Sequence, residues 1–248
     1  MKIETVLTVA QSKRLIARGV VHHPNVRAAF HNGVIGICRG TTCSAVAEEF
    51  LGRAIEKFGY TTGVTMPKNL EGSFPAVTPA QEVMHDIIIR RGEIHMDGET
   101  VIDAAKNMSP GDVIIKGANA LNYAKGIAGC LVGHPAGGTS GGFWGPLYGR
   151  KLRLIIPVGL EKEIAGDILE ASAECMEENA GNALMPLTGV IITEIEAICI
   201  LTGAHALQIA AGGIRGAEGS VRLLISGNQE EIREVNKIIS ALEQEKPY

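Results

Sequence analysis

Short apolar runs alternate with amphipathic stretches along the first 180 residues of the chain. Residues 34–38 and 112–116 have the continuous apolar character of buried strands. After the first of these strands, apolar residues recur at helical spacing over 43–57, and Gly59 would end that helix. This pattern predicts an α/β fold, with a Rossmann-like, mostly parallel sheet flanked by helices.

Further elements complete the first part of the chain. Two short helices broken at Pro24 are expected within 11–32, a hairpin-like pair of strands within 84–96, and a short helix over 100–107. Strands are expected over 127–132 and 152–158, followed by a helix over 163–178. Two segments rich in glycine, 60–79 and 133–150, read as loops. The segment 133–150 is much longer than the usual loop of about four to six residues, and such long loops are often functional.

The pattern changes from residue 181. Strands near 191–200, 207–210 and 221–225 precede a helix over 229–245 that has one apolar face. We therefore predict two domains, an α/β ligand-binding domain over 1–180 and a small C-terminal α+β lobe over 181–248. The turn residues 212–220 fit a hairpin connection or, alternatively, a second ligand-facing loop.

Composition and charge argue against several classes of protein. The 248 residues are 46% hydrophobic, and the formal charge of −4 comes without a Lys/Arg-rich run, so nucleic acid is not an expected partner. No apolar run approaches the roughly 20 residues of a membrane span, so we expect a cytoplasmic protein without a membrane partner. The five cysteines are scattered, and no residues stand at metal-ligand spacing. We therefore expect no disulfide framework, metal or cofactor.

The turn between the first main strand and its helix is the strongest candidate site. Gly40, Thr41, Thr42 and Ser44 lie where the first amides of a helix have no partner inside the helix, and such amides bind anions. Alternatively, one of the three hydroxyl groups could be a simple N-cap. The thiol of Cys43, in the same turn, could gain reactivity from the helix dipole or pack as a small hydrophobic group.

Polar residues also follow two later strands. Lys116 and Asn119 come after 112–116, and Glu161 and Lys162 come after 152–158, at the edge where open parallel sheets bind ligands. Lys116 could pair with a ligand anion, Asn119 could form a hydrogen bond with a ligand, and Glu161 could act as a general base. Each also has an ordinary interpretation: a solvated lysine, a loop-forming asparagine, and a glutamate that begins a helix.

The glycine-rich segment 133–150 carries further candidates. Gly137, Gly138, Thr139 and Ser140 could form a second anion site, because successive glycines let backbone amides converge on one ligand. His134, at the start of the segment, suits proton transfer or phosphate contact. The alternative is a flexible loop with an exposed histidine.

Three segments of the chain resemble the superfamily of ribose-5-phosphate isomerase, glucosamine-6-phosphate deaminase and the CoA-transferases. Residues 12–53 resemble the opening helix, strand, phosphate loop and helix of the isomerase, with 39–43 matching the loop. Residues 111–121 are similar to its D-x-x-I-D-G-A-D-E-V strand and loop, and 133–164 to its glycine-rich loop and following strand. The resemblance covers residues 10 to 175 and implies that Lys162 contacts the substrate.

The chain departs from the isomerase at positions that carry chemistry. The loop carboxylates of the isomerase match Lys116 and Asn119 here, and neither is a carboxylate. The glutamate that the isomerase places after its glycine-rich loop falls near Tyr148 or Gly149. An isomerase-like proton transfer would therefore need another base. The candidates are Glu161, Lys116 and His134.

These patterns together predict a protein that binds a phosphorylated sugar or a related phosphorylated metabolite. The phosphate would lie on residues 40–44, and the polyol end near Lys116, Asn119 and Lys162. Two alternatives are a non-catalytic, effector-binding protein on the same fold, and an enzyme like an acyl-CoA transferase with Glu161 as its nucleophile. A homo-oligomer is expected from the resemblance and from the general frequency of cyclic dimers.

Overall fold

The main body of the protein is an α/β arrangement around a mixed, mostly parallel six-stranded sheet. The computed structural model describes residues 1–63, 65 and 84–246. In these residues the strand order is β10-β8-β5-β2-β3-β4. Four strands run parallel, namely β2 (Val34–Ile37), β5 (Val113–Ile115), β8 (Arg153–Pro157) and β10 (Val190–Ile192). Strands β3 (Ile87–Arg90) and β4 (Glu93–His95) add an antiparallel edge, so the predicted α/β class is confirmed.

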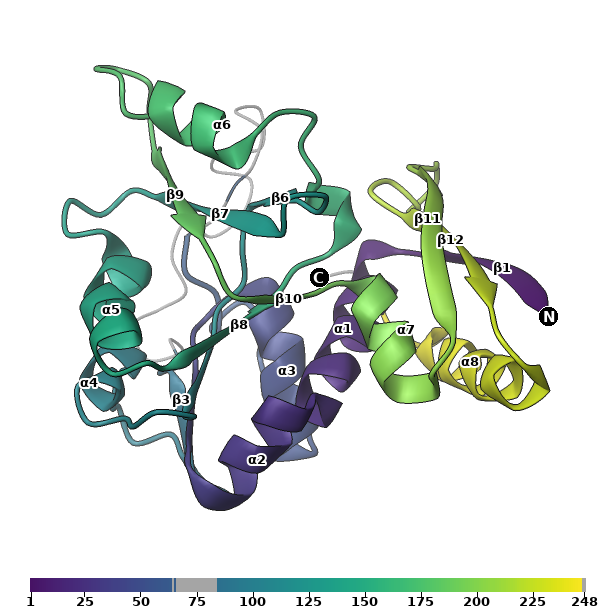
Figure 1. Ribbon diagram of the computed structural model, residues 1–248, viewed down its shortest axis with the longest axis horizontal. Helices are drawn as coiled ribbons and strands as arrows, with labels where there is room; N and C mark the ends of the chain where they lie inside the picture. The colour runs from purple at the N-terminus through teal and green to yellow at the C-terminus, as the bar shows by residue number, and fades with distance from the viewer. Residues whose placement is uncertain (64, 66–83, 247–248) are drawn as a thin grey trace.

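Helices cover both faces of this sheet (Figure 1). One face carries α1 (Val9–His22), α2 (Pro24–Asn32), α3 (Thr41–Leu51) and α7 (Glu194–Thr202). The other face carries α4 (Val101–Ala105) and α5 (Gly138–Gly149). The central strands are almost wholly apolar because both of their faces are buried in this way.

Two smaller antiparallel sheets flank the main sheet. The first has the order β6-β7-β9, with β6 (Ala120–Asn122), β7 (Ile127–Val132) and β9 (Ala183–Leu187), and contacts α6 (Ile168–Glu174). The second has the order β1-β12-β11, with β1 (Lys2–Leu7), β11 (His205–Ala211) and β12 (Val221–Ser226). It lies at the side of the molecule together with α8 (Gln229–Leu242) (Figure 1). The predicted division at residue 180 does not follow these sheets, because β1 pairs with β12 and β9 pairs with β7.

Several predicted elements are confirmed. Two helices meet at Pro24, residues 84–96 contain the strand pair β3 and β4, and residues 212–220 connect the antiparallel strands β11 and β12 as a hairpin. The predicted loop over 60–79 lies largely outside the described residues. Strand β1 was not predicted, and α3 ends at Leu51 rather than near residue 57. It ends there because Gly52 adopts a left-handed conformation with a φ of 63°.

The prediction of a long loop over 133–150 is wrong, because α5 occupies most of that segment. Glycine weakens helices in isolation, so the composition favours a loop. Here the helix is stabilised by packing: Phe143 and Leu147 are buried, and α5 contacts α4. A Cβ on Gly142 would lie 2.5 Å from Cδ1 of Ile102 on α4, so this glycine allows the two helices to approach closely.

The predicted strand over 191–200 is also wrong. Strand β10 ends at Ile192, and α7 begins immediately after Thr193, whose side chain forms a capping box with Glu196. Only part of the helix predicted over 163–178 forms, as α6, after a short 3-10 helix, η2 (Leu160–Lys162).

A close approach between α1 and α7 fixes the relative position of these two helices, both of which contribute residues to the candidate site. A Cβ on Gly19 of α1 would lie 2.7 Å from Cβ of Ala197 on α7, so only glycine allows this packing. In the first half of α1, the side chain of Ser12 contacts Glu194, the first residue of α7. Among the described helices, none is long and apolar enough to cross a membrane.

Candidate functional site

The parallel strands of the main sheet end at one edge, and a polar segment follows each of them. Residues 38–44 follow β2, 116–119 follow β5, 159–162 follow β8, and Thr193 and Glu194 follow β10. Strand β3 runs the opposite way, with Ile87 opposite Ile37, so Asp86, directly before β3, lies at the same edge. Open α/β sheets bind ligands at the carboxyl ends of their parallel strands. We call this region the carboxyl edge.

Helix α3 begins at the carboxyl edge without a side-chain cap among the described residues. Its N-cap residue is Gly40, and no atom of the described residues lies within 4 Å of the position that a Cβ on Gly40 would take. The hydroxyl of Ser44, a buried residue like Thr42, donates to the carbonyl of Thr41 at 2.7 Å. The simple capping interpretation is therefore wrong. The positive end of the helix dipole is directed to the carboxyl edge.

Lys116 lies among three cysteine thiols at the same edge. Its ammonium contacts the thiol of Cys130 and donates to the carbonyl of Gly117, with an Nζ–O distance of 3.3 Å. Burial raises the pKa of Cys38 and of Cys43, and the positive charge of Lys116 opposes it. The two thiols are therefore protonated at neutral pH. Cys43, despite its place in the first turn of α3, packs as a small hydrophobic group.

Two more lysines reach this region from different elements. Lys162 of η2 donates from Nζ to the carbonyl of Ala118 at 2.8 Å. Lys13 of α1 is only 9% exposed, and its pKa is lowered to about 8. Burial is the main cause; the positive charge of Lys162 lowers the pKa further, whereas the carboxylate of Glu161 opposes both. Such a perturbed, partly buried lysine is a functional-site candidate.

Two carboxyl groups complete the cluster. Glu161 of η2 folds back over Gly159, where a Cβ would overlap its Oε2 atom. Glu194, the first residue of α7, is fully buried and accepts hydrogen bonds from the amide of Leu160 at 3.0 Å and from the hydroxyl of Ser12. The pKa of Glu194 is raised to about 7. Burial is the larger cause, and the negative charge of Glu161 is the second. We call Lys13, Lys116, Glu161, Lys162 and Glu194 the edge cluster.

Asn119 and His134, both predicted site residues, make hydrogen bonds within the surrounding backbone. The side-chain oxygen of Asn119 accepts from the amide of Leu131 at 3.0 Å. Nδ1 of His134, in the connection between β7 and α5, accepts from the amide of Ala136 at 3.1 Å. Both residues are exposed. These two contacts are structural, and ligand contact by either residue stays a prediction.

The predicted second anion site is the N-terminal end of α5. Gly137 is the N-cap residue, with a left-handed backbone at a φ of 79°, and Gly138, Thr139 and Ser140 form the first turn. Ser140 is buried, and its hydroxyl has no hydrogen-bond partner in the described residues. As in α3, no side-chain cap is present among the described residues. An anion at this helix end stays a prediction.

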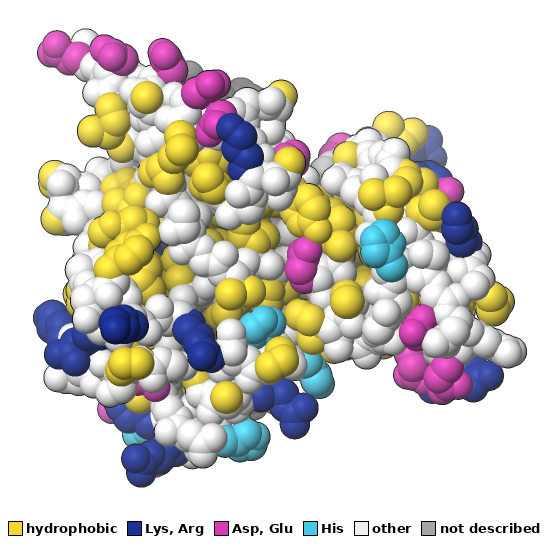
Figure 2. Space-filling view, viewed as in Figure 1, with side chains coloured by type: hydrophobic (Ala, Val, Ile, Leu, Met, Phe, Trp, Pro, Cys, Tyr) yellow, Lys and Arg dark blue, Asp and Glu magenta, His cyan; other side chains and the backbone are white. Residues whose placement is uncertain are grey.

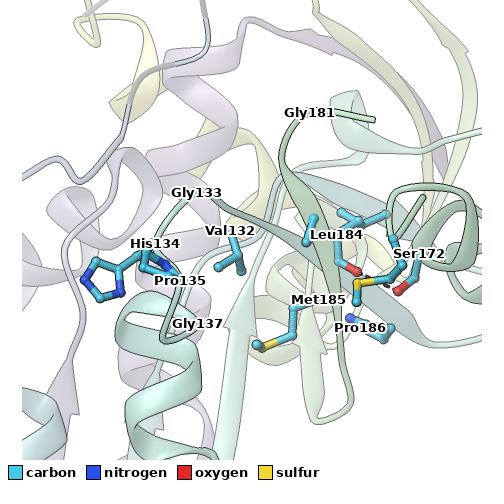
Figure 3. A pocket seen from close by; sticks show the side chains of 12 residues that line it. Val132, Gly133, His134, Pro135, Gly137, Ser172, Gly181, Leu184, Met185 and Pro186 are labelled. Carbon is cyan, nitrogen blue, oxygen red and sulfur yellow. Dashed lines mark hydrogen bonds between the residues drawn. The ribbon is translucent and has the colours of Figure 1, made fainter. Parts of the chain in front are cut away.

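A groove of about 540 Å³ runs between the β7–α5 connection and strand β9. His134 and Gly137 line one side, and Ser172, Leu184 and Met185 line the other (Figure 3). Apolar side chains gather on this side of the molecule (Figure 2). No member of the edge cluster lines the groove. Of the predicted site residues, only His134 and Gly137 line this largely apolar groove, whereas the predicted charged residues Lys116, Glu161 and Lys162 lie at the carboxyl edge.

Sequence reasoning missed Lys13, Glu194 and Ser12. Lys13 stands three residues before Ile16 on the buried stripe of α1, and a lysine on an apolar stripe is a signal that could have identified it. Glu194 was hidden inside a predicted strand. The T-x-x-E spacing of Thr193 and Glu196 could have marked the start of a helix at the end of β10.

In the described residues, no group of three or more His, Cys, Asp or Glu side chains could hold a metal ion. No family model matches the chain, and no curated protein or solved structure matches it either. The function is therefore argued from the carboxyl edge itself.

Proposed function

We propose that the protein binds a phosphorylated sugar or a related phosphorylated metabolite at the carboxyl edge. One observation carries the proposal: Lys13, Lys116 and Lys162 come from three different elements and gather beside the start of α3, where the described residues provide no side-chain cap. Like charges brought together at a partly buried site repel one another, and a bound anion relieves that repulsion. A phosphate group would accept hydrogen bonds from the first amides of α3 and from the lysine ammonium groups.

The nearby acidic groups balance only part of this positive charge. Glu161 faces Lys13, but Glu194 is held largely neutral at a pH below 7 by its raised pKa. Asp86, at the same edge, has its own partner in Arg39, with an Oδ1–Nε distance of 3.9 Å. This excess of positive charge supports an anionic ligand over a neutral one.

The proposal includes proton transfer by Glu161 to or from the bound metabolite. Of the three predicted bases, Glu161 is the one that is both a carboxyl group and a member of the edge cluster. His134 lies apart from the cluster, in the lining of the groove. General acid–base assistance contributes about 10²- to 10⁴-fold in rate.

We also propose that the main sheet is Rossmann-like, because polar residues follow the carboxyl ends of its parallel strands. The resemblance to the isomerase superfamily, the cytoplasmic location and the homo-oligomer stay predictions.

Replacing Lys162 by methionine tests the binding proposal. Methionine keeps the apolar stem and removes the ammonium group. We expect ribose 5-phosphate to bind about 30-fold more weakly, because a hydrogen bond to a charged group is worth about 2 kcal/mol and each tenfold change in affinity corresponds to about 1.4 kcal/mol. Titration calorimetry measures the change.

Lys106→Met is the matched control, because Lys106 directly follows α4, with its side chain 60% exposed and paired with Asp103. This variant should bind ribose 5-phosphate as the wild type does. Inorganic phosphate and unphosphorylated ribose complete the panel, and ribose should not bind. The proposal is wrong if no phosphorylated sugar binds, or if the Lys162 and Lys106 variants have the same affinity as the wild type.

A further inference from the structure

Glu161 and Glu194 have a feature in common that their hydrogen bonds do not explain. In the described residues, Oε2 of Glu161 and Oε1 of Glu194 are both buried and have no hydrogen-bond partner. A buried carboxylate oxygen without a partner is strongly destabilising. A proton bound between two carboxyl groups removes this cost, because one group then donates a hydrogen bond that the other accepts.

The surroundings favour one proton rather than none or two. Three donors stabilise a negative charge on Glu194, namely its own amide, the amide of Leu160 and the hydroxyl of Ser12. Lys13 of α1 adds a positive charge on the side of Glu161. Burial and the mutual repulsion of the two carboxylates act against a second negative charge. The donors and Lys13 therefore favour one negative charge on the pair, whereas burial and mutual repulsion disfavour a second.

The fold holds the two carboxyl groups in place. Glu161 belongs to η2, whose backbone amide at Leu160 donates to Glu194, so the two glutamates are tied through one hydrogen bond. Glu194 begins α7, and the close packing of α7 on α1 at Gly19 fixes it against Ser12. Charged neighbours come from η2 and α1, as Lys162 and Lys13, with Lys57 near Lys13.

We propose that Glu161 and Glu194 share one proton and form the acid–base centre of the carboxyl edge. Glu161 exchanges a proton with the bound metabolite, and Glu194 is a positioning residue that holds the shared proton. The pair carries one proton at rest, takes a second from the ligand when Glu161 acts as a base, and returns one when it acts as an acid. The exchange step rests on the proposed function, whereas the shared proton does not.

The shared proton is tested by carbon-13 NMR on protein labelled at the glutamate side-chain carboxyl groups. In the wild type we expect two coupled titration steps that belong to both resonances, because strongly interacting groups titrate as a pair. In Glu161→Gln, the resonance of Glu194 should titrate in a single step shifted to lower pH, because the charge of Glu161, which helps to raise the pKa of Glu194, is gone. Amide spectra of each variant confirm that it is folded.

The proposal is overturned if the two wild-type resonances titrate independently and Glu161→Gln leaves the titration of Glu194 unchanged. This outcome is separate from the calorimetric test above. If ribose 5-phosphate binds and loses affinity in Lys162→Met, but the carboxyl groups titrate independently, the proposed binding function stands and the shared proton does not.

The exchange step has its own readout. Ribose 5-phosphate is incubated with the protein in D2O, and proton NMR follows the loss of the signal from the hydrogen on carbon 2. We expect exchange in the wild type, a loss of at least 100-fold in Glu161→Gln, and a shifted pH profile in Glu194→Gln. No exchange in the wild type, or an unshifted profile in Glu194→Gln, would overturn the assignment of these roles.

Discussion

Replacing Glu194 by glutamine should stabilise the protein at pH 8 and change its stability little at pH 4.5. In the folded protein the pKa of Glu194 is about 7, against an ordinary value of 4.5. Between pH 4.5 and pH 7, the folded chain therefore keeps a proton on Glu194 that the unfolded chain has lost. Wild-type stability therefore falls as the pH rises through this window, and the loss is complete above pH 7.

The expected size of this effect follows from the two pKa values. One pKa unit corresponds to about 1.4 kcal/mol, so the ionisation of Glu194 costs about 3 kcal/mol above pH 7. Glutamine carries no charge at any pH, and its amide group can donate to the unpaired oxygen of Glu161. Urea unfolding of both proteins at pH 4.5, 6 and 8 measures the difference.

Glu174→Gln is a suitable control for the same chemical change, because Glu174 is exposed at the end of α6. Its effect on the free energy of unfolding should be small at all three pH values. If Glu194→Gln destabilises the protein by the same amount at pH 4.5 and pH 8, the raised pKa of Glu194 and its burial beside a second carboxyl group are both contradicted.

Replacing Lys13 by methionine should stabilise the unliganded protein and weaken the binding of ribose 5-phosphate. The pKa of Lys13 is lowered from 10.5 to about 8, chiefly by burial. Between pH 8 and 10.5 the unfolded chain holds more protons, so this group makes stability rise with pH; below pH 8 its full penalty is present. We expect a gain of about 2 kcal/mol at pH 7. This is less than the full penalty, because the attraction between the ammonium group and Glu161 is lost as well.

Lys13→Met also removes one of the three positive charges that we propose to bind the phosphate group. Affinity for ribose 5-phosphate should fall at least tenfold, a loss of about 1.4 kcal/mol or more. Urea unfolding at pH 7 and pH 10 and calorimetry give the two quantities. Lys2→Met, at an exposed residue at the start of β1, should change neither. A destabilised protein with unchanged affinity would mean that Lys13 has only a structural role.

Much of the fold could be predicted because its strands are continuous apolar runs. β2, β5 and β8 lie where the pattern of residues 34–38, 112–116 and 152–158 indicates. The errors arise where tertiary contacts override local preference. Gly142 weakens a helix in isolation but allows α5 to pack on Ile102.

The candidate site could be predicted only where its residues directly follow strands. Lys116, Glu161 and Lys162 do so, and the edge cluster contains all three. Lys13 and Glu194 come from two helices, and nothing in their local sequence brings them together. Their proximity depends on the packing of α1 against α7, a contact between residues far apart in the chain.

The central claim is that the carboxyl edge holds a phosphate group, and crystals soaked in tungstate test it most directly. Tungstate is a tetrahedral oxyanion like phosphate, and its metal gives strong anomalous scattering. We predict an anomalous peak beside the first turn of α3, within hydrogen-bond distance of Nζ of Lys162. A peak only at the start of α5, or no peak at the carboxyl edge at a concentration that occupies other sites, would contradict the claim.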